Sequence, residues 1–365
     1  MLNTGKFFKR YHSLIFGFEK TLEKYINWKI KYSDSTEKDI NQNKASIIRI
    51  LSIINKRWIH SISIESAERS IDELRHYPKN ATKNRILKNL SHRERLRVAK
   101  DLKTEKLADY TIKKDIEVCS TFFNWCISRG YAKENPFRYI NRSKLNKTNK
   151  RQIFTPIELE RIFTCHLYKK ESLLHSYYYW IPLLLRYTGA RLNELCCLEK
   201  EDLKSIEGIY YLSINDESEN KRIKNSCSHR SIPLHRELIR LGFIDFVNRI
   251  PSGRIFSSLK PIDGYYSHSA SNWFSRVRQR LNLGIGKDAH SFRHTFTDEL
   301  YQNEVPEDII VNLVGHGSSN SGKISITRSV YSKGFDPRIY QPYIDKISSV
   351  HTAHIRSFDK IKIKR

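Results

Sequence analysis

Several side chains in the second half of the sequence could bind a phosphate group. Arg191 lies in "YTGARLNEL", and His290 and Arg293 lie three residues apart in "AHSFRHTFTDEL". Residues at that spacing share one face of a helix. An arginine presents a planar, permanently charged fork that matches the oxygens of a phosphate. These residues therefore predict a binding site for an anionic ester.

Two later segments add a histidine and a nucleophile. His316 follows a glycine in "NLVGHGSSN", and Tyr331 lies in "ITRSVYSKG". A phenol titrates near ~10, so it attacks at neutral pH only beside a base or within a cationic field. Each segment alone is a weak signal, because the chain holds 20 tyrosines and 14 histidines.

Metal chemistry is a competing interpretation of the histidines. His290 and His294 stand four residues apart, as two zinc ligands on one helix do. The glutamate of an H-E-x-x-H motif is missing, and no cysteine or aspartate supports the pair. We therefore expect no metal and no other cofactor. No carboxylate pair, G-x-S-x-G motif or glycine-rich phosphate loop suggests another chemistry.

The spacing of apolar residues predicts the helices and strands that carry these side chains. In the first half, Ile112, Ile116, Cys119, Phe123 and Cys126 recur at spacings of three and four, which predicts a helix. Other segments of that half also favour helices. The second half is mixed. "TPIELERIF" begins with a capping box, and "GIYYLSI" and "RSIPL" predict two strands flanking a basic hairpin tip.

Length and charge bound the class of protein. A chain of 365 residues favours two domains, and its net charge of +26 favours a polyanionic partner, naturally nucleic acid. The basic segment "NRSKLNKTNKRQIF" suggests a linker. We expect a helical part at 1–142, a linker at 143–154, a mixed part at 155–335 and a tail at 336–365. The tail is expected either to dock on a neighbouring protomer or to be a disordered basic segment.

The cellular location is predicted from membrane-span, signal-peptide and cysteine patterns. The longest apolar run, "YYYWIPLLL", contains Pro182 and is closed by Arg186, so we expect no membrane span. The first residues do not match a signal peptide. The six cysteines form no C-x-x-C pair, which favours reduced core residues in a cytoplasmic protein.

The motifs in their order resemble the catalytic domain of the tyrosine recombinases, the phage integrase family. "TGARLNEL" resembles the family's first arginine box, "HSFRHTF" its H-x-x-R box, "LVGHGS" its glycine-histidine turn and "VYSKG" its nucleophile segment. Residues 110–137 resemble the last helices of its core-binding domain. The resemblance implies a mostly α fold with a small antiparallel β-sheet (α+β). It also implies that 1–142 is a helical DNA-binding (core-binding) domain and that 155–335 is the catalytic domain.

The resemblance also implies a mechanism. Tyr331 would attack a DNA phosphate and form a 3′-phosphotyrosyl link, while Arg191 and Arg293 clamp the non-bridging oxygens. His290 would be the base and His316 a phosphate ligand. A hairpin lysine would protonate the 5′ leaving oxygen. Lys224, six residues before Arg230, fits the family pattern best, with Lys221 as a rival. Glu194 would support a neighbouring basic group.

The implied partner is double-stranded DNA, bound by a homo-tetramer on two sites. Accessory DNA-bending proteins are possible further partners. Two other functions stay open. A type IB topoisomerase-like enzyme would use the same phosphotyrosine chemistry without a paired site. A catalytically silent DNA-binding protein would have an architectural role. The choice among phage integration, transposition and chromosome resolution stays open too.

One spacing departs from the family. Fifteen positions separate His316 from Tyr331, which is longer than the family's commonest spacing. A lengthened loop costs little entropy. Tyr340 and Tyr343 are the fallback nucleophiles, but neither precedes a Ser-Lys-Gly turn, and Pro337 and Pro342 lie close to them.

The nucleophile assignment makes a direct prediction. Tyr331→Phe removes the attacking hydroxyl, so this variant is expected to form no covalent adduct with a nicked suicide DNA, as judged by denaturing gel electrophoresis. Tyr340→Phe and Tyr343→Phe are the matched controls and should keep the adduct. An adduct formed by Tyr331→Phe would show that another residue attacks.

Overall fold

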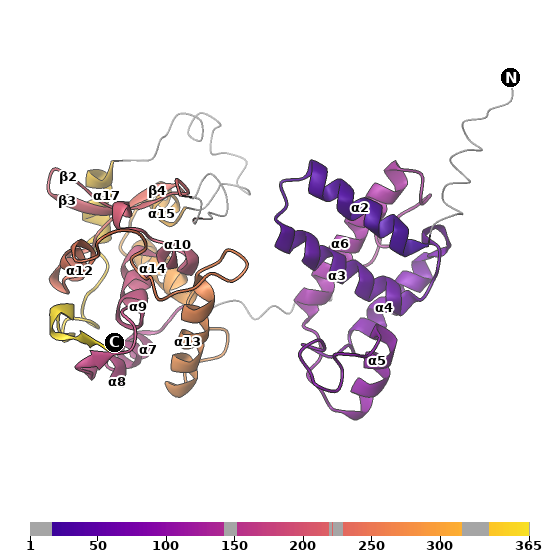
Figure 1. The fold of residues 1–365 in the computed structure, drawn as a ribbon, viewed down its shortest axis with the longest axis horizontal. Coiled ribbons are helices and arrows are strands. Elements are labelled where there is room, and N and C mark those ends of the chain that lie inside the picture. The colour runs from indigo at the N-terminus through magenta and orange to yellow at the C-terminus, as the bar shows by residue number, and fades with distance from the viewer. Residues whose placement is uncertain (1–16, 142–151, 219–220, 222–228, 316–335, 365) are drawn as a thin grey trace, which may run out of the picture. The chain divides into compact units, whose positions relative to one another are not determined.

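The computed structural model describes residues 17–141, 152–218, 221, 229–315 and 336–364 (Figure 1). The chain separates into two compact units, Met1–Asn149 and Lys150–Arg365. In these described residues, no helix is long and apolar enough to cross a membrane. The domain and linker boundaries drawn from the sequence stay predictions.

The secondary-structure elements in the described part of unit 1 are helices, joined by turns and loops. The five interior positions predicted for the helix at 112–126 are fully buried, which confirms that period. Gly130 follows this helix with a φ of 76°, as expected for a residue that ends a helix. The α-helices of unit 1 are α2 (Phe18–Tyr32), α3 (Glu37–Ile54), α4 (Ile64–Leu74), α5 (His92–Asp101) and α6 (Asp109–Ser128).

Unit 2 combines helices with two small sheets. Its first helix, α7 (Pro156–Phe163), begins at the predicted capping box of Thr155 and Glu158, with proline in the first turn. The other helices are α8 (His166–Lys169), α9 (Tyr177–Thr188), α10 (Leu192–Cys196), α11 (Arg236–Arg240), α12 (Phe243–Asn248), α13 (Ser267–Arg280), α14 (Ser291–Gln302), α15 (Glu307–Val314) and α17 (Pro337–Ile344). Short 3-10 turns lie at Lys200–Asp202 and Phe358–Lys360.

The larger sheet is antiparallel in the order β2-β3-β4, built from β2 (Leu203–Ile206), β3 (Ile209–Ile214) and β4 (Arg230–Pro233). The strands predicted in "GIYYLSI" and "RSIPL" are confirmed as β3 and β4. The sequence did not predict strand β2, because apolar and polar residues do not alternate in "LKSI". The tight turn between β2 and β3 has positive φ at Glu207 and Gly208, as two-residue hairpin turns require.

The apolar period of "HRELIRLGFIDFVNRI" is typical of one helix, but the segment forms two, α11 and α12. Gly242 adopts a φ of 86° between α11 and α12. The periodic apolar residues continue across this glycine, so the periodicity concealed the break. Both helices still bury their apolar side chains in the core of unit 2.

Residues 336–364 correct one of the two expectations for the tail, that it is a disordered basic segment, while docking on a neighbouring protomer stays a prediction. Residues 336–364 pack into the core of unit 2, where Tyr340, Ile344 and Phe358 are buried. Strand β5 (Lys362–Ile363) pairs in parallel with β1 (Ser172–Leu173). The segment therefore folds onto its own chain, which its basic composition did not reveal.

Phe358 tests this packing, since its ring lies near Tyr179, Trp180 and Phe246. Phe358→Ala is expected to lower the free energy of unfolding by about 3 kcal/mol, because it removes a large buried ring. Ile363→Ala, at a position 39% exposed, is the control and should cost clearly less. Chemical denaturation measures both. A tail that docks on a neighbouring protomer would instead make the midpoint depend on protein concentration.

Candidate functional site

The site begins where α9 ends against α14. Gly189 ends α9 with a φ of 58°, and a Cβ at this position would overlap the ring of Phe296 in α14. Only glycine combines that backbone conformation with so close an approach. The carbonyl of Gly189 accepts a hydrogen bond of 2.9 Å from Arg293 Nη1. The turn at Gly189 thus contacts Arg293 directly.

Arg293 is 2% exposed, and it carries a guanidinium nitrogen that the described part of the chain leaves without an acceptor. Its Nη2 is buried and has no hydrogen-bond partner among the described residues. Burial, followed by the charges of Arg191 and Arg230, lowers the pKa of Arg293 to about 9. The group is still charged at neutral pH, and a buried anion beside it would be strongly favoured.

Arg191 is the N-cap residue of α10 and forms a double contact with Glu194. Its backbone N–H donates to Glu194 Oε2 at 2.8 Å, and its Nη1 donates to Oε1 at 2.7 Å. Its Nη2 donates to the carbonyl of Gly315 at 2.9 Å. The expectation that Glu194 supports a neighbouring basic group is therefore confirmed. Arg191 therefore contacts Gly315, the last described residue before His316.

A second arginine shares Glu194, and sequence reasoning gave it no role. Arg230, on β4, donates from Nη2 to Glu194 Oε2 at 2.7 Å and from Nε to the carbonyl of Leu313 at 2.8 Å. Burial alone would raise the pKa of Glu194, but the charge and hydrogen bond of Arg230, together with Arg191, hold it below its ordinary value. The pattern "RSIPL" signalled a strand but not this contact.

His290 is the N-cap residue of α14, so it precedes the helix that carries Arg293. Its backbone N–H donates to Asp288 Oδ1 at 2.8 Å. Its ring lies edge to face with that of His294, with centroids 5.1 Å apart. Lys287, in the same loop, is paired with Glu158. Across the residues that the structure describes, no three His, Cys, Asp or Glu side chains are grouped as a metal would require.

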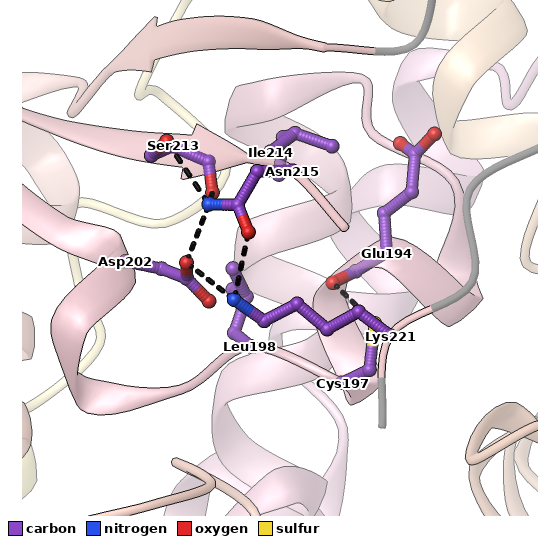
Figure 2. Close-up of a pocket in the computed structure, with 8 residues that line it drawn as sticks. All are labelled: Glu194, Cys197, Leu198, Asp202, Ser213, Ile214, Asn215 and Lys221. Carbon is purple, nitrogen blue, oxygen red and sulfur yellow. Dashed lines mark hydrogen bonds and ion pairs between the residues drawn. The ribbon is translucent and has the colours of Figure 1, made fainter. Parts of the chain in front are cut away.

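Lys221 lies in a small pocket beside the sheet (Figure 2). Its Nζ contacts Asp202 Oδ1 at 2.7 Å, Asn215 Oδ1 at 2.9 Å and Glu199 Oε2 at 3.3 Å. Burial would lower the pKa of Lys221, but the hydrogen bond and charge of Asp202, with those of Glu199, raise it. A proton is hard to release from such a site, so the contacts suit an anchor for the hairpin better than a proton donor.

Three predicted site residues, Lys224, His316 and Tyr331, lie outside the described residues. The structure therefore brings together Arg191 and Arg293 and places His290 at the start of the same helix as Arg293. Of the fallback nucleophiles, Tyr340 is 2% exposed and buried in the core of unit 2. Tyr343 packs on the edge of that core.

The described site can hold an anion. Arg191, Arg230 and Arg293 bring three positive charges and Glu194 brings one negative charge, so two positive charges remain among these four groups. Burying that surplus is costly unless a partner of opposite charge binds. The arrangement is suited to a phosphate, whose oxygens accept several guanidinium hydrogen bonds.

Comparison with known proteins gives a family for the part of the chain that carries this site. Residues 152–324 match the family model of the phage integrase family. They hold Arg191, Glu194, His290, Arg293 and His316 in the order expected. Residues 152–324 therefore form a domain of this family, that of the tyrosine recombinases.

Curated relatives give the same family. The chain is 27% identical over 256 residues to a XerC-like tyrosine recombinase of Caldanaerobacter subterraneus subsp. tengcongensis, covering 61% of this chain and 62% of that relative. It is 24% identical over 227 residues to a tyrosine recombinase of Agathobacter rectalis, covering 59% and 70%. The match thus spans less than two thirds of the first relative.

Solved structures share the fold. The integrase of transposon Tn1549 in complex with circular intermediate DNA has a TM-score of 0.56 at 19% identity, covering 87% of this chain and 97% of that one. A lambda integrase tetramer bound to a Holliday junction has a TM-score of 0.53 at 14% identity, covering 85% and 80%. The predicted fold class is confirmed: mostly α with a small antiparallel sheet, in a helical and a catalytic part.

Gly189 offers a test of the local geometry. Gly189→Ala is expected to lower the free energy of unfolding by about 2–4 kcal/mol, because it adds backbone strain and a clash with Phe296. Gly208→Ala is the matched control, since Gly208 has a φ of 82° but no atom within 4 Å of an added Cβ. It should cost only the strain, about 1–2 kcal/mol. Equal losses in urea denaturation would contradict the close packing at Gly189.

Proposed function

We propose that the protein is a site-specific DNA recombinase that cleaves and rejoins strands through a covalent 3′-phosphotyrosyl intermediate, without metal or ATP. The observation that carries the proposal is the surplus positive charge around Glu194, with Arg293 Nη2 buried and unpaired within the described part of the chain. A scissile phosphate of DNA supplies the missing anion. The net charge of +26 favours the same polyanionic partner.

In the cleavage step, the phenolic oxygen of Tyr331 attacks the phosphorus, and the bond from phosphorus to the 5′ oxygen breaks. The new ester keeps the energy of the old one, so a 5′-hydroxyl can reverse the step on the same or another strand. Arg191 and Arg293 stabilise the charge that grows on the non-bridging oxygens. Their rigid attachment to Gly189, Glu194 and Gly315 supports this role, because preorganised donors need no rearrangement during the reaction.

Two proton transfers complete the step. His290 accepts the phenol proton, and His316 binds the phosphate. Lys224 donates a proton to the leaving 5′ oxygen. The support for Lys224 over Lys221 is indirect: Lys221 is held by Asp202, Asn215 and Glu199, and its pKa is raised.

Recombination requires two DNA sites, so we propose that a homo-tetramer forms on DNA, with accessory DNA-bending proteins able to join. The lambda integrase structure is a tetramer on a Holliday junction, and its fold resembles that of this chain. The cytoplasmic location stays a prediction from the cysteines and the N-terminal sequence.

Trapping on DNA tests the function. In a nicked duplex, cleavage releases the short fragment that carries the 5′-hydroxyl, so the protein should remain covalently attached to the DNA. Substrates with two paired sites should yield recombinants. The absence of any adduct with DNA that the protein demonstrably binds would favour a silent DNA-binding protein. Relaxation of supercoils without recombinants would favour a topoisomerase-like enzyme.

The proton donor has its own test. Lys224→Ala is expected to slow adduct formation by about 100-fold or more, because the leaving oxygen then departs unprotonated. A substrate with a 5′-bridging sulfur, which needs no acid, should restore the rate. Lys221→Ala is the comparison. The sulfur substrate should not restore any rate of adduct formation that this variant loses, since Lys221 anchors the hairpin. Rescue of Lys221→Ala alone would assign the acid to Lys221.

A further inference from the structure

Arg230 closes a ring of contacts that includes the phosphate-binding Arg191. The members of this Glu194 ring are Arg191, Glu194, Arg230, Leu313 and Gly315. Glu194 accepts from both arginines, Arg230 donates to the carbonyl of Leu313, and Arg191 donates to that of Gly315. The ring ties α10, β4 and the end of α15, which are far apart in the sequence.

The ring ends at the C-terminus of α15, where helix carbonyls lack intrahelical donors. Each arginine supplies one of these carbonyls with a donor. Gly315 adopts a φ of 64°, and a Cβ there would lie 2.9 Å from Arg230 Nη1. The glycine is thus required by backbone conformation and by the guanidinium that packs against it.

Arg230 is built to hold other groups rather than to bind substrate. Its side chain is 4% exposed, and the side chain of Glu194 beneath it is 3% exposed. Its Nε and Nη2 are already engaged by Leu313 and Glu194. By contrast, the side chain of Arg191 is 21% exposed, so of the two arginines on Glu194 it is the more accessible.

We propose that Arg230 is a positioning residue for strand cleavage: through Glu194 it sets Arg191, and through α15 it sets the turn that leads into His316. This inference rests on the proposed recombinase function. Without Arg230, one oxygen of Glu194 loses its buried charged partner and the end of α15 loses a donor. Arg191 then moves relative to the phosphate, and a displacement of ~1 Å can cost on the order of 100-fold in rate.

The test uses the full chain and the nicked suicide DNA, with single-turnover adduct formation and DNA affinity measured separately. Arg230→Met is expected to slow adduct formation about 100-fold while the affinity for DNA stays within about threefold. Arg249→Met, which removes one positive charge at an exposed position of unit 2, is the matched control and should keep the wild-type rate.

A conservative variant and a double variant separate positioning from general stability. Arg230→Lys keeps the charge but loses the planar fork, so it should reach Glu194 or Leu313 but not both and recover only part of the rate. Arg230 acts through Glu194, so the Arg230→Met and Glu194→Gln losses should be strongly non-additive. Additive losses would show that Arg230 works by another route.

The remaining outcomes are also decisive. A rate for Arg230→Met within about threefold of wild type would overturn the inference, as would a parallel loss of DNA affinity and rate. Should Arg230→Met fail to fold, as judged by circular dichroism, Arg230→Lys is held to the same rate and affinity criteria. Failure of the wild-type chain itself to form an adduct would count against the recombinase function, and the variants would not be needed to see it.

Discussion

The pairing of one buried carboxylate, Glu194, with two arginines sets the arrangement of this site. Glu194 is 5% exposed, so its charge is tolerated only because Arg191 and Arg230 donate to both of its oxygens. Removing water from these groups strengthens each contact and fixes its direction. These ion pairs join α10 to β4, and the hydrogen bonds of the two arginines to Leu313 and Gly315 add the end of α15 around a surplus of positive charge.

The rest of unit 2 keeps that surplus in place. Helix α9 is buried along its whole length and ends at Gly189, whose carbonyl holds Arg293. Residues 336–364 complete the core around α9, so that the last part of the chain supports the first arginine box. Arg293 is left with an unpaired Nη2 within the described residues and a lowered pKa. That costs stability in the free protein and favours any phosphate that enters.

The sequence predicted the fold class, the capping box at Thr155 and strands β3 and β4. Those features are local, or they follow from motifs that hold specific residue types at fixed spacing. The break at Gly242 and strand β2 were missed because their apolar patterns do not mark an end or an alternation. The packing of residues 336–364 was missed because it depends on contacts with α9 and α12, which no local pattern encodes.

The same limit explains the site. Arg191 and Arg293 could be named from their motifs, whereas Arg230 could not, because a strand arginine in "RSIPL" gives no sign that it meets Glu194 from a distant segment. Lys221 shows the converse. A lysine in a basic hairpin suggested a proton donor, and only the three-dimensional contacts with Asp202, Asn215 and Glu199 indicate an anchor.

We infer that the scissile phosphate binds at the surplus of positive charge around Glu194. A crystal structure of the wild-type chain trapped on nicked suicide DNA tests it most directly. The account predicts a phosphate esterified to Tyr331, with its non-bridging oxygens about 3 Å from Arg293 Nη2 and from the guanidinium of Arg191. A covalent phosphate that lies away from both arginines, or is attached to another tyrosine, would contradict it.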